Sequence, residues 1–171
     1  MVLDFNKKLA EALKDIAYTT ECHTFVVHEH EKEWDKSDEE GFIERYGAAK
    51  WGIIEKLNAK YGDVLLRKAD LYNWFYHIEE DEVAYFLSEA GSNCMNYSEF
   101  KAPYQFWLWL GEKGFIMGIE QRGRGFCAIE IDQKGMKENE GAAFEFYRRC
   151  SSLIFFDDAR CAKTVYFEVK F

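Results

Sequence analysis

The sequence predicts a single α+β domain, residues 1–171, in which a helical N-terminal half packs on an antiparallel β-sheet. Apolar residues recur at helical spacing through most of the N-terminal half, whereas short aromatic and β-branched runs follow it. The chain is 48% hydrophobic and contains one proline, so it has enough apolar surface for a sizeable core. Helices followed by strands favour an α+β arrangement over an alternating α/β one.

The first predicted helix covers residues 4–18, where apolar side chains follow the i, i+3, i+4 and i+7 spacing of one helix face. Asp4 is suited to cap its N-terminus. The run 22–30 contains β-branched and aromatic residues and is predicted to be a strand. Residues 64–78 are open between helix and strand, with helix slightly favoured.

A longer helix is predicted from the capping-box pattern of Ser37 and Glu40 to about residue 61. Gly62 follows it at the position where a glycine often ends a helix. A third helix is predicted over residues 80–90, with Gly91 as its stop.

The second half of the sequence predicts a sheet. Strands are expected at 104–110, 115–120 and 126–132, joined by glycine-containing turns into a three-stranded meander. A helix is predicted over 138–152, and a strand over 164–171 closes the chain. The expected order is therefore a meander, a helix and a C-terminal strand.

Composition excludes several classes of protein. Charged residues interrupt the N-terminal segment, so we expect no signal peptide, and no apolar run is long enough to span a membrane. The five cysteines are widely spaced without a CxxC pair, which favours reduced thiols and a cytoplasmic location. A pI near 5.0 makes direct nucleic-acid binding an unfavoured function.

The acidic residues are concentrated in two blocks. Residues 29–44 have a net charge of −6 and residues 79–89 a net charge of −5, while the whole chain is −9. Acids at the start of a helix are favoured by the helix dipole, which explains part of the first block. The second block has a weaker structural reason, so it is the first place to look for a functional surface.

Segregated acid predicts a binding or inhibitory protein that contacts a basic protein partner. Small immunity proteins and nucleic-acid-mimicking inhibitors act in this way, and the comparison rests on charge and size alone. No nucleophile and base stand in a recognisable order, so catalysis is not favoured, and no cofactor is indicated. The predicted partner-binding residues are Glu29, Glu31, Glu33, Asp35, Glu39, Glu40, Glu79, Glu80, Asp81 and Glu82.

A metal-dependent enzyme is the first alternative. On a strand, His28 and His30 would face the same side and could bind one metal, with His23 or Glu33 as a further ligand. Two histidines on the wet face of a strand are the simpler interpretation.

The C-terminal segment offers a second possible metal site. Asp157 and Asp158, followed by Glu168 and Lys170 on one strand face, resemble the PD-(D/E)xK nuclease pattern. The resemblance implies carboxylates that hold Mg²⁺ and a lysine that activates water or neutralises charge. The motif is short, and an edge strand of alternating apolar and charged residues would look the same.

Two further sets of residues could contact ligands. Arg122 and Arg124, in a glycine-rich turn, could contact an anion or simply occupy an exposed hairpin. An aromatic cluster could form a small-molecule pocket or belong to the core. Its members are Tyr72, Trp74, Tyr76, Trp107 and Trp109. The strand 104–110 is apolar on both faces, so it could also be covered by a second copy of the chain.

Overall fold

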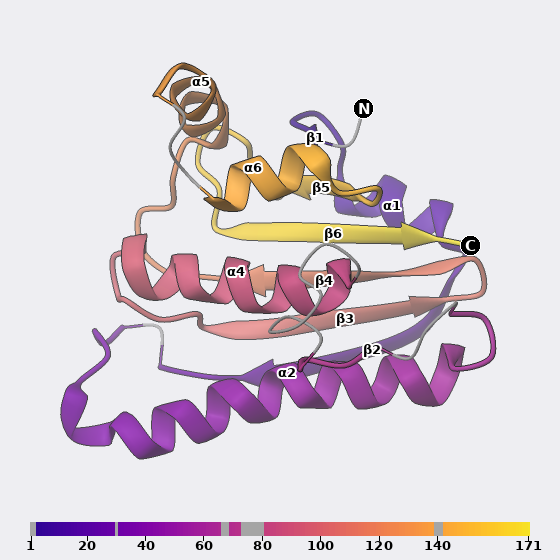
Figure 1. Cartoon of the computed structure of the whole chain (residues 1–171), viewed down its shortest axis with the longest axis horizontal. Coiled ribbons are helices and arrows are strands. Elements are labelled where there is room, and N and C mark those ends of the chain that lie inside the picture. The colour runs from indigo at the N-terminus through magenta and orange to yellow at the C-terminus, as the bar shows by residue number, and fades with distance from the viewer. Residues whose placement is uncertain (1–2, 30, 66–68, 73–80, 139–141) are drawn as a thin grey trace.

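The computed structural model describes residues 3–29, 31–65, 69–72, 81–138 and 142–171. These residues form a six-stranded sheet with helices on both faces, which confirms the predicted α+β class (Figure 1). The strand order is β1-β5-β6-β4-β3-β2. The strands are β1 (Leu3–Asp4), β2 (Tyr18–Val26), β3 (Gln105–Gly111), β4 (Gly114–Glu120), β5 (Leu153–Phe156) and β6 (Thr164–Lys170).

The sheet is mixed rather than wholly antiparallel. β1 pairs parallel with β5, while every other neighbouring pair is antiparallel. β3 and β4 form the predicted hairpin, but β4 pairs next with the C-terminal strand β6. The aromatic strand β3 is therefore hydrogen-bonded on both sides, and β2 is one edge of the sheet.

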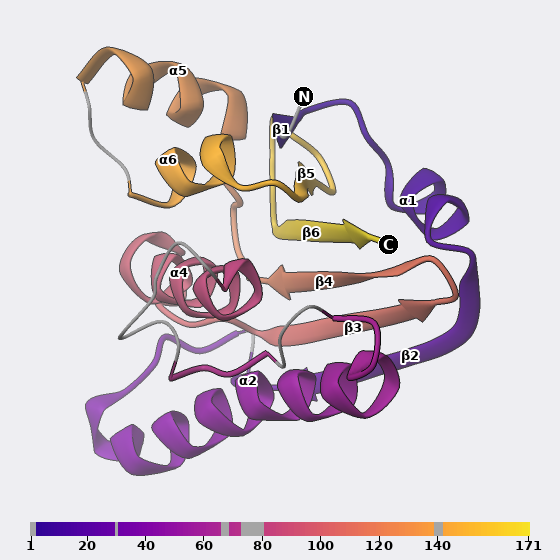
Figure 2. The ribbon, with the colours of Figure 1, turned by 45° about the vertical axis from the view of Figure 1, so that its right-hand side comes forward.

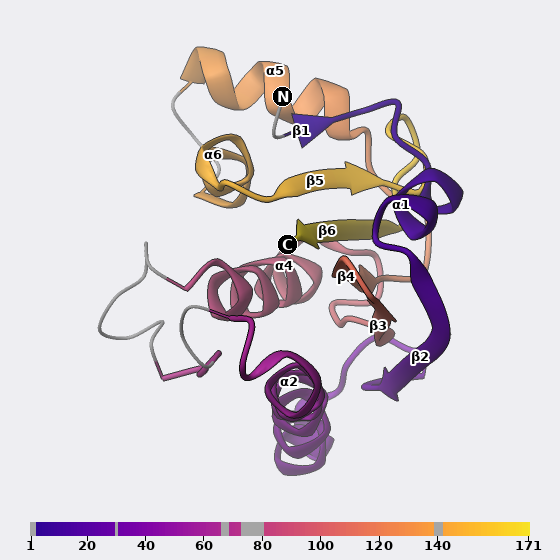
Figure 3. The same cartoon turned by 90° about the vertical axis from the view of Figure 1, so that its right-hand side faces the viewer.

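Helices cover one face of the sheet extensively and the other in part. Figures 1 and 2 show α4 between α2 and α6, and Figure 3 shows α1 on the opposite side of the sheet. The helices are α1 (Leu9–Asp15), the 3₁₀ helix η1 (Lys36–Asp38), α2 (Glu39–Tyr61), α4 (Glu82–Tyr97), α5 (Ala128–Glu138) and α6 (Ala142–Arg149).

Alternation along the strands divides the apolar side chains between two cores. Phe106, Phe115 and Phe167 point toward α2 and α4 and belong to the larger core. Trp109 and Tyr166 point toward α1 and belong to a smaller core with Ile16 and Ile116. A sheet that is apolar on both faces therefore accounts for much of the aromatic content.

The largest error of the sequence prediction concerns residues 126–132. They were expected to be the third strand of the meander, but Phe126 forms only an isolated bridge to Ala162, and α5 begins at Ala128. A short apolar run fits both the two-residue repeat of a strand and the 3.6-residue repeat of a helix, and from Ala128 on the chain is helical. The short strands β1 and β5 were not among the predicted elements.

The N-terminal helix is shorter than predicted. It covers Leu9–Asp15, and the Asp4 carboxylate accepts hydrogen bonds from the backbone N–H groups of Asn6 and Lys7 before the helix begins. The next strand starts at Tyr18, four residues earlier than the predicted boundary at residue 22, and ends at Val26. Boundaries shift because tertiary pairing, rather than local propensity, determines where a strand begins.

The ends of the other helices also differ from the prediction. The Ser37 capping box does not form, because Asp35 accepts the Ser37 backbone N–H and α2 starts at Glu39. Gly62 has φ −55°, so it supplies no left-handed cap. α4 continues through Gly91 to Tyr97, and the helix predicted over 138–152 is α6.

The structure describes part of the ambiguous segment 64–78. Residues 64–65 and 69–72 have turn or irregular backbone rather than a helix, and residues 66–68 and 73–78 lie outside the described residues.

Two glycines within α2 are expected to respond oppositely to alanine. A Cβ at Gly52 would lie 2.4 Å from the Phe25 ring, whereas a Cβ at Gly47 would meet no atom within 4 Å. Gly47→Ala should raise the free energy of unfolding by about 0.5–1 kcal/mol, because alanine loses less backbone entropy in a helix. Gly52→Ala should lower it by about 1–3 kcal/mol through overpacking. Urea denaturation of both variants tests this, and equal shifts would contradict it.

Candidate functional site

The first acidic block forms one exposed end of the molecule. We call residues 29–44 the acidic end, and each of its eight carboxylate side chains is exposed. It comprises the segment after β2, the 3₁₀ helix η1 and the first turns of α2, at the lower left of Figure 1. His30 within it lies outside the described residues.

Contacts with the body of the domain fix the acidic end in place. The Trp34 backbone N–H donates to the Phe100 carbonyl at 3.1 Å, and the Trp34 ring packs on Phe42 with centroids 5.0 Å apart. Arg45 of α2 holds the chain just after β2, because its Nε donates to the Val27 carbonyl at 2.8 Å. The carboxylates are therefore held on an anchored backbone while they point to solvent.

Few of these acids are neutralised within the domain. Lys32 lies 2.7 Å from Glu29 and lowers the pKa of that carboxyl, and Arg45 lies 2.7 Å from Asp38. The hydrogen bond from the Ser37 backbone N–H lowers the pKa of Asp35. Within the described residues, no ion pair is found for Glu33, Asp35, Glu39, Glu40 or Glu44.

The second acidic block has a structural role where it is described, at the helix N-terminus that the sequence allowed its first residues to serve. Asp81 is buried as the N-cap of α4 and accepts the backbone N–H groups of Ala84 and Asp70 at 3.0 and 3.2 Å. Glu82 accepts hydrogen bonds from the backbone and hydroxyl groups of Ser151 and Ser152.

The remaining acids of this block do not add to a described surface. Glu89 is half-buried, and burial raises the pKa of its carboxyl. Glu79 and Glu80 lie outside the described residues. The candidate acidic surface is therefore the acidic end.

Of the predicted histidine pair, His28 is not on a strand, and His30 lies outside the described residues. β2 ends at Val26, and the Nε2 atom of His28 lies 2.8 Å from the Lys32 carbonyl oxygen. His23 is on β2, where its ring pairs with Glu21 at 3.0 Å. Among the residues that the structure describes, no group of three or more His, Cys, Asp or Glu side chains is placed to hold a metal ion.

The nuclease-like residues lie at opposite ends of β6. Asp157 follows β5 and accepts the backbone N–H groups of Lys163 and Thr164, each at 3.0 Å. Glu168 stands four residues further along β6, about 13 Å away at the usual rise of a strand. Asp158 is exposed and accepts the Arg160 backbone N–H. The structure does not bring the carboxylates together around one site.

Glu168 and Lys170 instead join an ion-pair network that the sequence did not reveal. The Glu168 side chain is fully buried, with Lys7 Nζ 3.3 Å from Oε2 and Lys170 Nζ 3.3 Å from Oε1. Neither lysine is aligned as a hydrogen-bond donor, so within the described residues Glu168 has ionic partners only. Asp15 pairs with both lysines. The network links α1 and its preceding loop to β6.

Both arginines of the glycine-rich turn have carboxylate partners. Arg122 Nε lies 2.9 Å from Glu120, and its guanidinium stacks 4.2 Å above the Tyr104 ring. Arg124 Nε lies 3.7 Å from Glu99, and its side chain is 89% exposed. An anion contact here stays a prediction, and it would have to compete with these carboxylates.

The predicted aromatic cluster is divided between the two sides of the sheet. Trp107 and Trp109 stack with centroids 5.4 Å apart on the α1 side, and Trp107 Nε1 donates to Glu120 at 2.9 Å. Tyr72 packs against Trp51 of α2, on the other side. Trp74 and Tyr76 lie outside the described residues. An oligomer through the aromatic strand stays a prediction.

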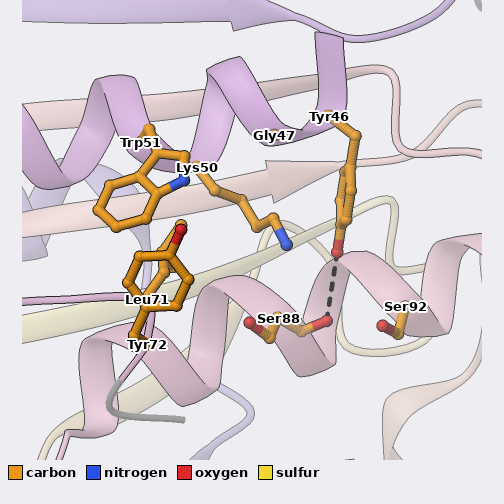
Figure 4. Close-up of a pocket in the computed structure, with 8 residues that line it drawn as sticks. All are labelled: Tyr46, Gly47, Lys50, Trp51, Leu71, Tyr72, Ser88 and Ser92. Carbon is orange, nitrogen blue, oxygen red and sulfur yellow. Dashed lines mark hydrogen bonds between the residues drawn. The ribbon is translucent and has the colours of Figure 1, made fainter. Parts of the chain in front are cut away.

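A pocket between α2 and α4 has a volume of about 260 Å³ and contains Tyr72 (Figure 4). Lys50 lies within it, with Nζ 4.2 Å from the centroid of the Tyr46 ring. The Tyr46 hydroxyl donates to the Ser88 carbonyl at 3.3 Å. Burial lowers the pKa of Lys50, and no carboxylate pairs with it among the described residues. In the sequence, only the i, i+4 spacing of Tyr46 and Lys50 indicated that these two side chains would be neighbours on a helix.

These features define an α+β domain with a mixed sheet, an anchored acidic end and a separate pocket. No helix in the described part of the chain combines the length and apolar character needed to cross a membrane. No protein-family model matches the chain, no curated protein is similar to it, and no solved structure matches it.

Proposed function

We propose that this protein is a binding or inhibitory protein that engages a basic protein partner through its acidic end. One observation supports this most directly. The acidic end has eight exposed carboxylates on a backbone that Trp34 and Arg45 fix to the domain. The comparison with immunity proteins and nucleic-acid mimics concerns charge and size.

An anchored array of carboxylates suits recognition of a basic surface. Complementary charge steers encounter and increases the association rate, and rigid placement reduces the entropy lost on binding. Ile43 lies between Glu40 and Glu44 in the sequence and is 58% exposed. An exposed isoleucine within a charged rim could supply apolar contact at the centre of an interface.

The proposed binding surface is narrower than the set of acids expected from the sequence. Asp81 and Glu82 already serve as acceptors within the domain, so their use by a partner would cost these hydrogen bonds. Asp35 likewise accepts the Ser37 backbone N–H, so the proposed contact residues are Glu33, Glu39, Glu40 and Glu44.

The test begins with capture of a partner from a native lysate of the source cells and titration of the purified partner. Replacing Glu33, Glu39, Glu40 and Glu44 together by Gln should weaken binding about tenfold or more at low salt, mainly by slowing association. The difference from wild type should shrink at about 0.5 M salt, where charges are screened.

A control variant distinguishes local from global charge. Glu55→Gln, Asp63→Asn, Glu112→Gln and Glu130→Gln together change the net charge by the same amount at exposed positions elsewhere. This variant should bind almost as wild type does. Equal weakening by both variants, or a partner whose binding ignores salt, would contradict the proposal.

A further inference from the structure

The pocket between α2 and α4 contains a positive charge that no carboxylate of the described residues neutralises. Lys50 is partly buried, and its ammonium faces the Tyr46 ring rather than a carboxylate among the described residues. A cation over an aromatic ring regains part of the lost hydration energy, but less than an anionic partner would. A bound anion would therefore stabilise the Lys50 ammonium further.

The walls of the pocket are mainly apolar and flat. Trp51 and Tyr72 lie on one side of Lys50 with their rings 5.4 Å apart and tilted by 54° (Figure 4). Leu71 adds aliphatic surface. Ser88 and Ser92, one turn apart on α4, lie on the other side and could donate hydroxyl hydrogen bonds.

We propose that this pocket binds a small aromatic carboxylate, with the carboxylate on Lys50 and the ring against Trp51 and Tyr72. The site is separate from the acidic end and does not depend on the proposed protein partner. A volume of about 260 Å³ is slightly below that of typical drug-sized sites, so it suits a one-ring ligand. One ammonium matches a monoanion, whereas a phosphate dianion would require more donors.

Phenylacetate is a suitable probe, and ligand-observed NMR with the full chain measures its binding. We expect a dissociation constant on the order of 1 mM, as befits a ligand of this size. The neutral analogue 2-phenylethanol should bind about tenfold more weakly, because it cannot form the charge-assisted contact. Acetate, which has no ring, should bind more weakly than phenylacetate by a similar factor.

Two variants test the residues. Lys50→Met should weaken phenylacetate binding about tenfold or more, whereas Lys56→Met, at an exposed position of the same helix, should leave it unchanged. Gly47 lines the pocket and a Cβ there meets only open space, so Gly47→Leu should fill the pocket and abolish binding while Lys50 itself is not replaced.

Circular dichroism verifies that each variant is folded. If Lys50→Met does not fold, Gly47→Leu still tests the pocket. The proposal is overturned if wild type does not bind phenylacetate at tens of millimolar, roughly tenfold above the expected constant. Equal binding of phenylacetate and 2-phenylethanol, or unchanged binding by Gly47→Leu, would also overturn it.

Discussion

Phe167→Ala is expected to lower the free energy of unfolding by about 3–5 kcal/mol, as large-to-small changes of buried phenylalanine do. The Phe167 side chain is fully buried in the larger core, and its ring stacks on Phe86 of α4 with centroids 5.0 Å apart. Strand neighbours Met117 and Ile154 surround it in the sheet. These strands limit collapse into the cavity, so the cost should lie near the top of this range.

Urea denaturation followed by far-UV circular dichroism measures the change, with a two-state fit. Phe171→Ala is the matched control, because Phe171 is 48% exposed at the end of the same segment. It should cost about 1 kcal/mol, in proportion to the smaller area buried. If both substitutions cost the same, the core between β6 and α4 is not packed as described.

Glu168→Ala is expected to cost about 3 kcal/mol, because it removes one partner from a buried ion pair. Glu168 follows Phe167 and points to the opposite face of the sheet, where its carboxylate meets Lys7 and Lys170. Lys7 is only 12% exposed, so the substitution leaves its ammonium with Asp15 alone. The same denaturation experiment measures the loss.

Two further variants separate the cost of removing one of the two carboxylate partners of Lys7 from other effects. Lys170 is 50% exposed, so Lys170→Met should cost less than about 1 kcal/mol. The double substitution Lys7→Met, Glu168→Met should cost less than Glu168→Ala, because it also removes the buried lysine that would otherwise lose one of its two carboxylate partners. A Glu168→Ala cost below about 1 kcal/mol would instead indicate an ordinary surface pair.

The network also predicts how the free energy of unfolding of the wild type depends on pH. Burial opposes the charge of Lys7, but hydrogen bonding to Asp15 and attraction by Glu168 outweigh it and raise the pKa of Lys7 above 10.5. Its contribution is present below that pH and is lost as pH rises through the folded pKa. Hydrogen bonds from Lys7 and Lys170 lower the pKa of Asp15 below 3.8, so its contribution is lost as pH falls. The stability that these two groups contribute to the wild type should therefore be largest between about pH 5 and pH 9.

The sequence predicted the elements whose patterns are long or distinctive. The helical repeat of residues 39–61 and the aromatic runs of β3 and β4 were sufficient to find those elements. Residues 126–132 were assigned to a strand wrongly, because a short apolar run has no unique period. The two-residue strand β1 exists only because β5 lies beside it.

The candidate sites were predictable to different degrees. The charge of the acidic end was evident from the composition of residues 29–44. Its anchoring was not, because the Trp34 contact with Phe100 joins segments far apart in the chain. The pocket around Lys50 likewise depends on α4, which supplies Ser88 and Ser92 from a distant part of the sequence.

By itself, the sequence determined the α+β class, the aromatic core and the position of the first acidic block, because these follow from local periodicity and composition. Tertiary structure decided which charged groups are free to act. In the folded protein, Asp81 and Glu82 accept hydrogen bonds from groups of the domain, and Glu168 is buried between two lysines. Lys50, in contrast, has no carboxylate partner among the described residues. The reason is physical: a charge is neutralised by its neighbours in space, and those neighbours are brought together only by folding.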